Sequence, residues 1–249
     1  MSKYATYLLG GTYGLGFRTR AIVGALYFYM KFILARKVEM TRIFGEDGRV
    51  RAATVLSATP VTVTQVKTKE GSDGYDAVQV ATGERKAKNV SKAVLGHTKG
   101  VGYRALREFP LPFGEAAGEA MEVGASIGVD TFVVGDAVRV SGLTKGRGFA
   151  GVVKRHRFHG GQRSHGQKHS EREPGSIGGS GGRAGGRVAK GIRMAGRMGQ
   201  DRVTVENLRV LAVDIKSGEL IVSGAVPGSR GTLLEVRSAT PASPAKRGE

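Results

Sequence analysis

The chain has 249 residues, 40 of them glycine, and its 39 Lys and Arg against 21 Asp and Glu give a formal net charge of +18. This length allows one or two domains with a hydrophobic core, and the charge predicts a polyanionic partner, nucleic acid before an anionic membrane surface. The absence of cysteine excludes a disulfide framework, a thiolate metal site and a cysteine nucleophile, and is typical of a reducing cytoplasm.

The N-terminal segment differs from the rest of the chain. Residues 1–30 hold five of the seven tyrosines and only three charged side chains. The apolar stretch 21–35 contains Lys31 and is shorter than the roughly 18 to 20 residues that a membrane span needs. No convincing cleavage site follows it, so a signal peptide is not favoured either. We therefore interpret residues 1–29 as an extension or a start codon assigned too early, with Met30 as the candidate start.

From Phe32 onward, short apolar runs separated by turns predict strands. "FILARKVEMTRIF" ends at the turn "GEDG", "VRAATVLSATPVTVTQVKT" is rich in Val and Thr, and "YDAVQVATG" alternates between two faces. "TFVVGDAVRVSG" predicts two short strands around Gly135 and Asp136. The stretch from Asn89 to Phe109 predicts one or two short helices or a loop.

A basic, glycine-rich segment follows. Residues 141–200 hold 13 Lys and Arg against two Asp and Glu, a net charge of +11, together with 17 glycines and four of the five histidines. After Val153 the segment has neither helical nor alternating apolar periodicity, so it cannot bury a core of its own. We expect it to become ordered only on a partner that neutralises its charge.

Strands return after this segment. "DRVTVENLRVLAVDI", "ELIVSGAV" and "TLLEVRS" alternate again, with turns at "KSG" and "PG". The sequence therefore predicts a mainly β fold, an antiparallel barrel that is closed or nearly closed, with the basic segment as a long insertion. The expected parts are the first part of the barrel at 30–144 with a short helical insert near 89–109, the extension at 145–200, the last strands at 201–238 and a disordered tail at 239–249.

"GRGFAG", residues 146–151, matches the dinucleotide-binding pattern G-x-G-x-x-G, and Glu171 lies about twenty positions further on. That pattern works only between a strand and a helix that crosses back to a parallel strand. No amphipathic period follows Gly151, and Glu171 stands in a polar loop. In a chain so rich in glycine we interpret the match as accidental, which leaves a nucleotide-dependent enzyme as a disfavoured alternative.

Histidines and serines of the basic segment offer two further alternatives. His156, His159, His165 and His169 have spacings that could suit zinc, but Arg and Lys lie between them and disfavour a bound cation. The pairs Ser164–His165 and Ser170–Glu171 lack a third orienting group for catalysis. We predict no catalytic residue, no metal and no cofactor, and expect the histidines to contact nucleic acid.

The pattern of cations favours RNA over a DNA duplex. Arg and Lys recur every three to six residues without helical phase, so they would meet phosphates along a winding path and not enter one major groove. The run "GGSGGRAGGR" lets the backbone pass through narrow gaps. A disordered basic linker and a free RNA chaperone remain as alternatives.

Several long motifs resemble a known family. "GLTKGRGFAGVVKRHRF", "SHGQKHSEREPGSIGG", "KGIRMAGRMGQDRVTVENLRV" and "SGAVPGSRG" are similar, in order and spacing, to the universal L-three family of large-subunit ribosomal proteins in its bacterial form. The resemblance covers roughly residues 30–237. It implies a translation-protein β-barrel on the outside of the large subunit and an extension that threads through 23S rRNA toward the peptidyl-transferase centre. It also implies an early role in assembly, contacts with neighbouring ribosomal proteins, a cytoplasmic ribosomal location, and neither catalysis, nor a small-molecule substrate, nor a membrane.

Charge and resemblance together select the expected RNA-binding residues at the base, middle, tip and return limb of the extension. They are Lys145, Arg147, Lys154, Arg155, His156, Arg157, Arg163, His165, Lys168, His169, Arg172, Arg183, Arg187, Lys190, Arg193 and Arg197. Three features depart from the family. Glu39 stands where members often have Gly, no glutamine lies between Gln167 and Gln200 to be methylated at the tip, and residues 1–29 have no counterpart.

Overall fold

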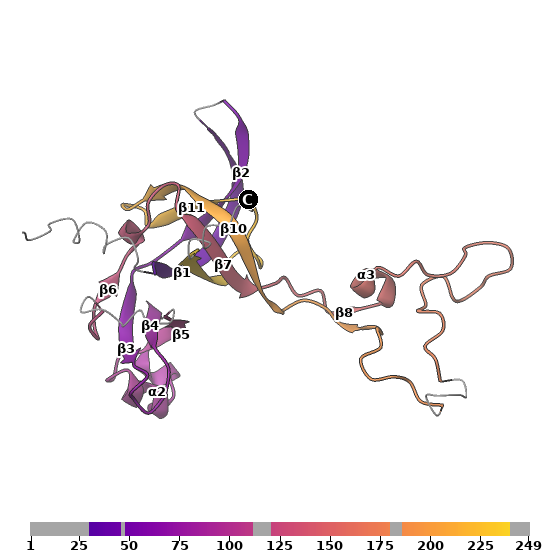
Figure 1. Cartoon of the computed structure of the whole chain (residues 1–249), viewed down its shortest axis with the longest axis horizontal. Coiled ribbons are helices and arrows are strands. Elements are labelled where there is room, and N and C mark those ends of the chain that lie inside the picture. The colour runs from indigo at the N-terminus through magenta and orange to yellow at the C-terminus, as the bar shows by residue number, and fades with distance from the viewer. Residues whose placement is uncertain (1–29, 46–47, 112–120, 180–185, 240–249) are drawn as a thin grey trace, which may run out of the picture.

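The computed structural model describes residues 30–45, 48–111, 121–179 and 186–239, and its main body is a closed six-stranded barrel (Figure 1). The strands follow the order β1-β12-β7-β10-β11-β2, and every neighbouring pair is antiparallel. The bounds are Phe32–Phe44 for β1, Val50–Ser57 for β2, Ala137–Leu143 for β7, Arg202–Asp214 for β10, Glu219–Ser223 for β11 and Leu233–Ser238 for β12. The mainly β fold and the antiparallel barrel predicted from the sequence are confirmed.

A second, four-stranded sheet lies against the barrel, and the sequence did not separate the two. Its order is β5-β4-β3-β6, with β3 at Val61–Lys67, β4 at Ala77–Glu84, β5 at Tyr103–Pro110 and β6 at Ser126–Ile127. The run that looked like one Val- and Thr-rich stretch is divided at residues 58–60, which end in Pro60. Because proline cannot donate to a ladder, the chain leaves the barrel there and enters the other sheet.

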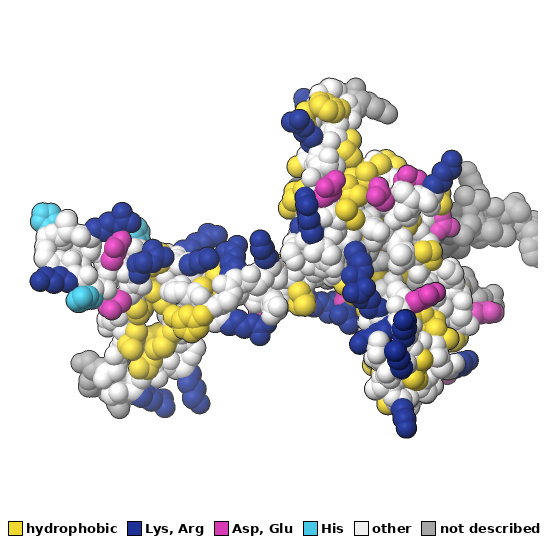
Figure 2. Space-filling view, turned by 180° about the vertical axis from the view of Figure 1, so that it is seen from behind, with side chains coloured by type: hydrophobic (Ala, Val, Ile, Leu, Met, Phe, Trp, Pro, Cys, Tyr) yellow, Lys and Arg dark blue, Asp and Glu magenta, His cyan; other side chains and the backbone are white. Residues whose placement is uncertain are grey.

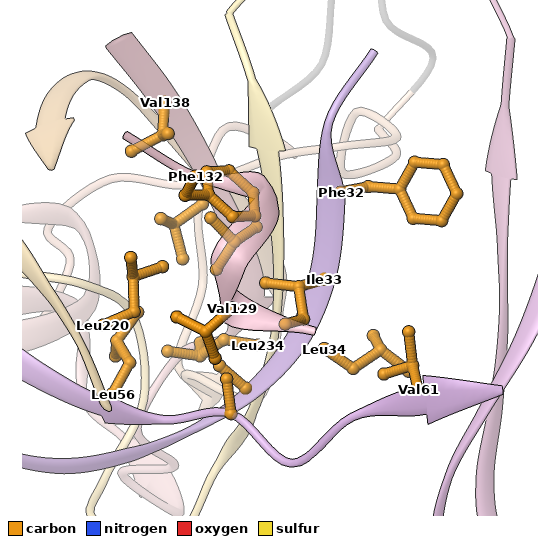
Figure 3. Close-up of a cluster of buried hydrophobic side chains, with 14 of the residues drawn as sticks. Phe32, Ile33, Leu34, Leu56, Val61, Val129, Phe132, Val138, Leu220 and Leu234 are labelled. Carbon is orange, nitrogen blue, oxygen red and sulfur yellow. The ribbon is translucent and has the colours of Figure 1, made fainter. Parts of the chain in front are cut away.

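The first four residues of β1 are buried on both faces, which explains the unbroken apolar run there. Ile33 points into the barrel toward Val129 and Leu234, whereas Phe32 and Leu34 point the other way, where Val61 of the second sheet lies (Figure 3). Residues 32–35 are accordingly all at most 1% exposed. One hydrophobic cluster therefore joins the inside of the barrel to its contact with the second sheet.

Two local predictions were only partly right. Residues 132–135 form no strand, because the one-turn helix η2 (Val129–Thr131) buries Phe132 and a turn follows, in which Asp136 Oδ2 accepts from Val133 N at 3.0 Å. In the stretch 89–109, α2 (Lys92–His97) is the short helix that was expected, and η1 (Ala87–Asn89) ends where the stretch begins. The second half of the stretch is strand β5, where the sequence predicted a helix or a loop. Charges at Arg104 and Arg107 follow a helical spacing there, but both are exposed on a strand that buries Phe109.

The contact between barrel and sheet has a polar layer beside its aromatic one. Glu235 of β12 is nearly buried and pairs with Arg107 of β5 at 3.2 Å, with Arg202 at the start of β10, and more distantly with Arg237 at 3.9 Å. Burial lowers the pKa of Arg237, and Glu235 opposes that effect. One carboxylate thus links the second sheet, the barrel and the strand that returns from the extension.

Candidate nucleic-acid interface

The basic segment leaves the barrel between two strands that are themselves paired. It departs after β7 and returns at β10, and Leu143 lies opposite Arg202 in their ladder. From there it projects far from the barrel and doubles back (Figure 1). The two barrel strands therefore hold both ends of the extension side by side.

Outgoing residues 144–151 and returning residues 194–201 form what we call the neck. Its backbone bonds include Thr144 N to Asp201 O at 2.9 Å and Met198 N to Gly148 O at 3.0 Å, and β8 (Phe149–Ala150) pairs with β9 (Gly196–Arg197). Gly199 has a φ of +82°, and a Cβ there would collide with the carbonyl oxygen of Lys145. The neck is thus an ordered two-stranded ladder in a segment that lacks apolar periodicity.

A short helix then ties the two limbs together. Helix α3, Val152–His156, begins after Gly151 and ends at Arg157, which has a left-handed φ of 60°. Arg155 Nη1 donates to the carbonyl of Met194 at 2.7 Å, and His156 Nε2 donates to the same oxygen at 3.1 Å. Arg155 and His156 are accordingly half-buried, and they stabilise the extension from within.

Beyond α3 the chain forms a loop that closes on itself. Gly161 N donates to Glu171 O at 2.9 Å, and Arg163 Nε pairs with Glu171 Oε1 at 2.6 Å. An open pocket of about 520 Å³ lies between residues 157–161 and 170–175. The segment has two acids, Glu171 and Glu173, and among the described residues only Glu171 forms an ion pair with a cation of the extension.

Most expected RNA-binding side chains point to solvent. Dark blue Lys and Arg side chains line the extension, and histidines gather at its far end (Figure 2). Arg183 lies outside the described residues. The exposed ones are Lys145, Arg147, Lys154, Arg157, Arg163, His165, Lys168, His169, Arg172, Arg187, Lys190, Arg193 and Arg197. The arrangement offers phosphate ligands around a narrow, extended segment, and not on one flat face.

The sequence missed two features of this surface. Phe149 in the neck is 81% exposed, although it is a large apolar side chain. The arginines around Glu235 were missed as well, because Arg107, Arg202 and Arg237 come from distant strands. Phe149 could have been found as the lone aromatic residue between Lys145 and Lys154, whereas only the fold brings the arginines together.

The described residues lack the geometry that a dinucleotide site or a histidine metal site would need. "GRGFAG" follows a strand whose ladders are antiparallel and precedes a helix of only five residues, so it forms no strand–turn–helix nucleotide unit. His165 and His169 lie in a loop and not on one helix face. Within the described ranges, no group of three or more His, Asp or Glu side chains could hold a metal ion. None of the helices described is long and apolar enough to span a membrane.

Glu39, the departure noted above, lies at a bulge. The register between β1 and β2 shifts between Lys37 and Glu39, and the Glu39 side chain lies 3.7 Å from Arg230. The side chain points to solvent at 54% exposure, so a residue larger than glycine is accommodated here.

Comparison with known proteins shows one family model and several relatives with the same name. The family model described as "Ribosomal protein L3" matches residues 115–219. The "Large ribosomal subunit protein uL3" of Herpetosiphon aurantiacus is 47% identical over 212 residues, which are 84% of this chain and 97% of that relative. The proteins of the same name from Halorhodospira halophila and Chlorobaculum tepidum are 48% and 46% identical, over 84% and 85% of this chain and 98% and 100% of their own lengths.

Proposed function

The chain belongs to the ribosomal protein L3 family, and on this premise we propose that it is a structural constituent of the large ribosomal subunit that binds 23S rRNA directly. The observation that carries the proposal is the extension. It has a net charge of +11, leaves a closed barrel through an ordered neck, and presents nearly all of its cations to solvent. Its internal bonds hold the neck together, and phosphates that surround its exposed cations would stabilise it further.

The two parts have different roles in this proposal. The barrel, with its own hydrophobic core, anchors the protein on the outside of the subunit and contacts neighbouring ribosomal proteins. The extension, residues 145–200, threads between rRNA helices toward the peptidyl-transferase centre. Because the extension lacks a core, it becomes fixed as the RNA folds around it, which suits a protein that acts early in assembly.

The contacts within the extension divide its cations into two groups. Arg155, through Nη1, and His156, through Nε2, donate hydrogen bonds to the carbonyl of Met194, and Arg163 pairs with Glu171. Arg147, Lys154 and Arg157 are exposed and free to meet phosphates. The first group holds the shape of the extension, and the second supplies most of the affinity for rRNA. In this proposal the protein works in the cytoplasm, bound to rRNA, and catalyses no reaction itself.

The test is sedimentation of the full chain with large subunits through a high-salt cushion. We expect the protein to pellet with the subunits, because an extension threaded between folded rRNA helices cannot leave them, even though salt weakens its phosphate contacts. A chain found wholly in the supernatant in low salt as well would end the proposal. Weak, exchangeable binding without a fixed position would instead indicate a free RNA chaperone that uses the same segment.

A further inference from the structure

Phe149 has an exposed ring on an ordered strand. It is the most exposed large hydrophobic side chain of the described residues, at 81%. The ring makes no aromatic stacking or cation–π contact within the described part of the chain. A single exposed aromatic is ordinary on a flexible loop, but this one stands on a paired strand of the neck.

The neck fixes the direction of this ring. Ala150, its neighbour in β8, is only 4% exposed. Because side chains alternate along a strand, Phe149 points to the opposite side from Ala150, toward solvent. Opposite Ala150 the partner strand has Gly196, and opposite Phe149 it has Arg197. The ring is thus held outward by the same ladder that closes the neck.

The charges around the ring select the occupant. Arg197 lies opposite Phe149 in the ladder, and its Nη2 donates to Gln200 Oε1 at 2.9 Å, three residues further along the returning limb. Its guanidinium makes no cation–π contact with the ring among the described residues. Lys145 and Arg147 are exposed just before it in the chain. An apolar protein partner would desolvate these cations without pairing them, which is costly. An unpaired nucleobase brings both a flat π surface and a phosphate on each side of its sugar.

We propose that Phe149 is a stacking platform for an unpaired base of the rRNA, with the adjoining phosphates on Arg147 and Arg197. This inference rests on the proposed function and names the first base contact of the extension where it leaves the barrel. Stacking on an aromatic side chain is tolerant of sequence, so the site recognises an unstacked base and not one particular nucleotide.

The experiment measures binding of the full chain to protein-free 23S rRNA over a series of salt concentrations. Phe149→Ala and Phe149→Leu should each weaken binding about 5- to 100-fold with an unchanged salt slope, and Phe149→Trp should bind like the wild type. Arg197→Ala is the matched control, because it should lower the slope by about one. Since the Phe149 ring is exposed, the melting temperature should not change in any of the three variants.

Three results would overturn the inference. Phe149→Leu that binds like the wild type would show a merely apolar contact. A salt slope that falls with Phe149→Ala would show an indirect loss of phosphate contacts. Full binding of Phe149→Ala to naked rRNA, with weakened incorporation into subunits, would assign the ring to a protein partner. In all three the wild type still binds rRNA, whereas failure of the proposed function would abolish that binding too.

Discussion

The ring of Phe109 in β5 stacks on the ring of Phe32 in β1, with 4.4 Å between centroids and 19° between planes. The guanidinium of Arg237 lies over the same Phe109 ring, 4.8 Å from its centroid. Arg237 is also the register partner of Phe32 in the β1–β12 ladder. The side chain of Phe109 therefore fastens the second sheet to the outer face of two barrel strands.

Replacement of Phe109 tests this fastening. Phe109→Ala should lower the free energy of unfolding by about 3–5 kcal/mol, because it removes a fully buried ring and leaves a cavity. Phe109→Leu keeps much of the volume and should cost clearly less. Urea unfolding followed by circular dichroism measures both. Equal losses in the two variants would contradict this expectation, because they would show that refilling the volume does not replace the contacts of the ring.

Glu235 should matter more than any one of its exposed arginine partners. Glu235→Gln leaves Arg237, whose side chain is only 13% exposed, without a counter-charge and should cost about 3 kcal/mol in unfolding free energy. Arg202→Ala removes only a half-exposed partner and should cost less than about 1 kcal/mol. Denaturant unfolding of the two variants side by side provides the comparison. A larger loss with Arg202→Ala would contradict the central position of Glu235.

The acid limit of stability should depend on Glu108. Its pKa is lowered first by the hydrogen bond from Lys67, and burial opposes the shift. A carboxyl whose folded pKa is depressed contributes stability above its unfolded pKa, about 4.3, and loses it as the pH falls through the folded value. Glu108→Gln should therefore flatten the pH dependence of unfolding below about pH 4.3. An unchanged acid slope would mean that the contact with Lys67 adds no stability.

The neck should be sensitive at one glycine and tolerant at another. Gly199→Ala forces a left-handed residue with a Cβ against the Lys145 carbonyl, a strain of about 1–3 kcal/mol, and should weaken rRNA binding. Gly151→Ala is the matched control, since Gly151 has a negative φ and open space around it. Filter binding reports rRNA affinity, and melting reports the barrel, which both changes should leave intact. Equal affinities of the two variants would show that the ladder does not position the extension.

Exposure predicts which of two neighbouring arginines meets phosphate. Arg157→Ala should weaken rRNA binding and lower its salt slope by about one, because this side chain is free. Replacing Arg155 as well should weaken binding further by releasing the carbonyl of Met194. Affinities over a salt series check both. A slope unaffected by Arg157→Ala would show that its guanidinium does not reach the RNA.

The fold could be predicted from the sequence where a pattern of residues is typical of only one kind of structure. The alternation of "DRVTVENLRVLAVDI" predicted β10 correctly. The net charge of residues 141–200 set the basic segment apart from the sequence alone. "YRALREF" was predicted as a helix or a loop but forms strand β5, because a strand with one solvent-exposed face can carry charges at helical spacing. The division into barrel and sheet is hard to predict from β2 and β3, since both are apolar strands in one Val- and Thr-rich run and only Pro60 marks the break between them. Tertiary contacts decide these cases.

The bracing within the extension was also beyond the sequence. Arg155 looked like any other cation of the segment, and only the approach of Met194 gives it an internal partner. Phe149 is the lone aromatic residue between Lys145 and Lys154, but the sequence alone does not show that its ring is exposed. Which of the exposed cations binds RNA stays a prediction.

The ladder between β7 and β10 has a last consequence for the length of the extension. Closing a long loop costs entropy, and here the barrel bears most of that cost, because its own folding already sets Leu143 opposite Arg202. Once the ends are joined, doubling the number of residues between them adds only about 0.6 kcal/mol. Evolution can therefore lengthen or trim the tip to suit the RNA it meets, with almost no penalty to the domain that carries it.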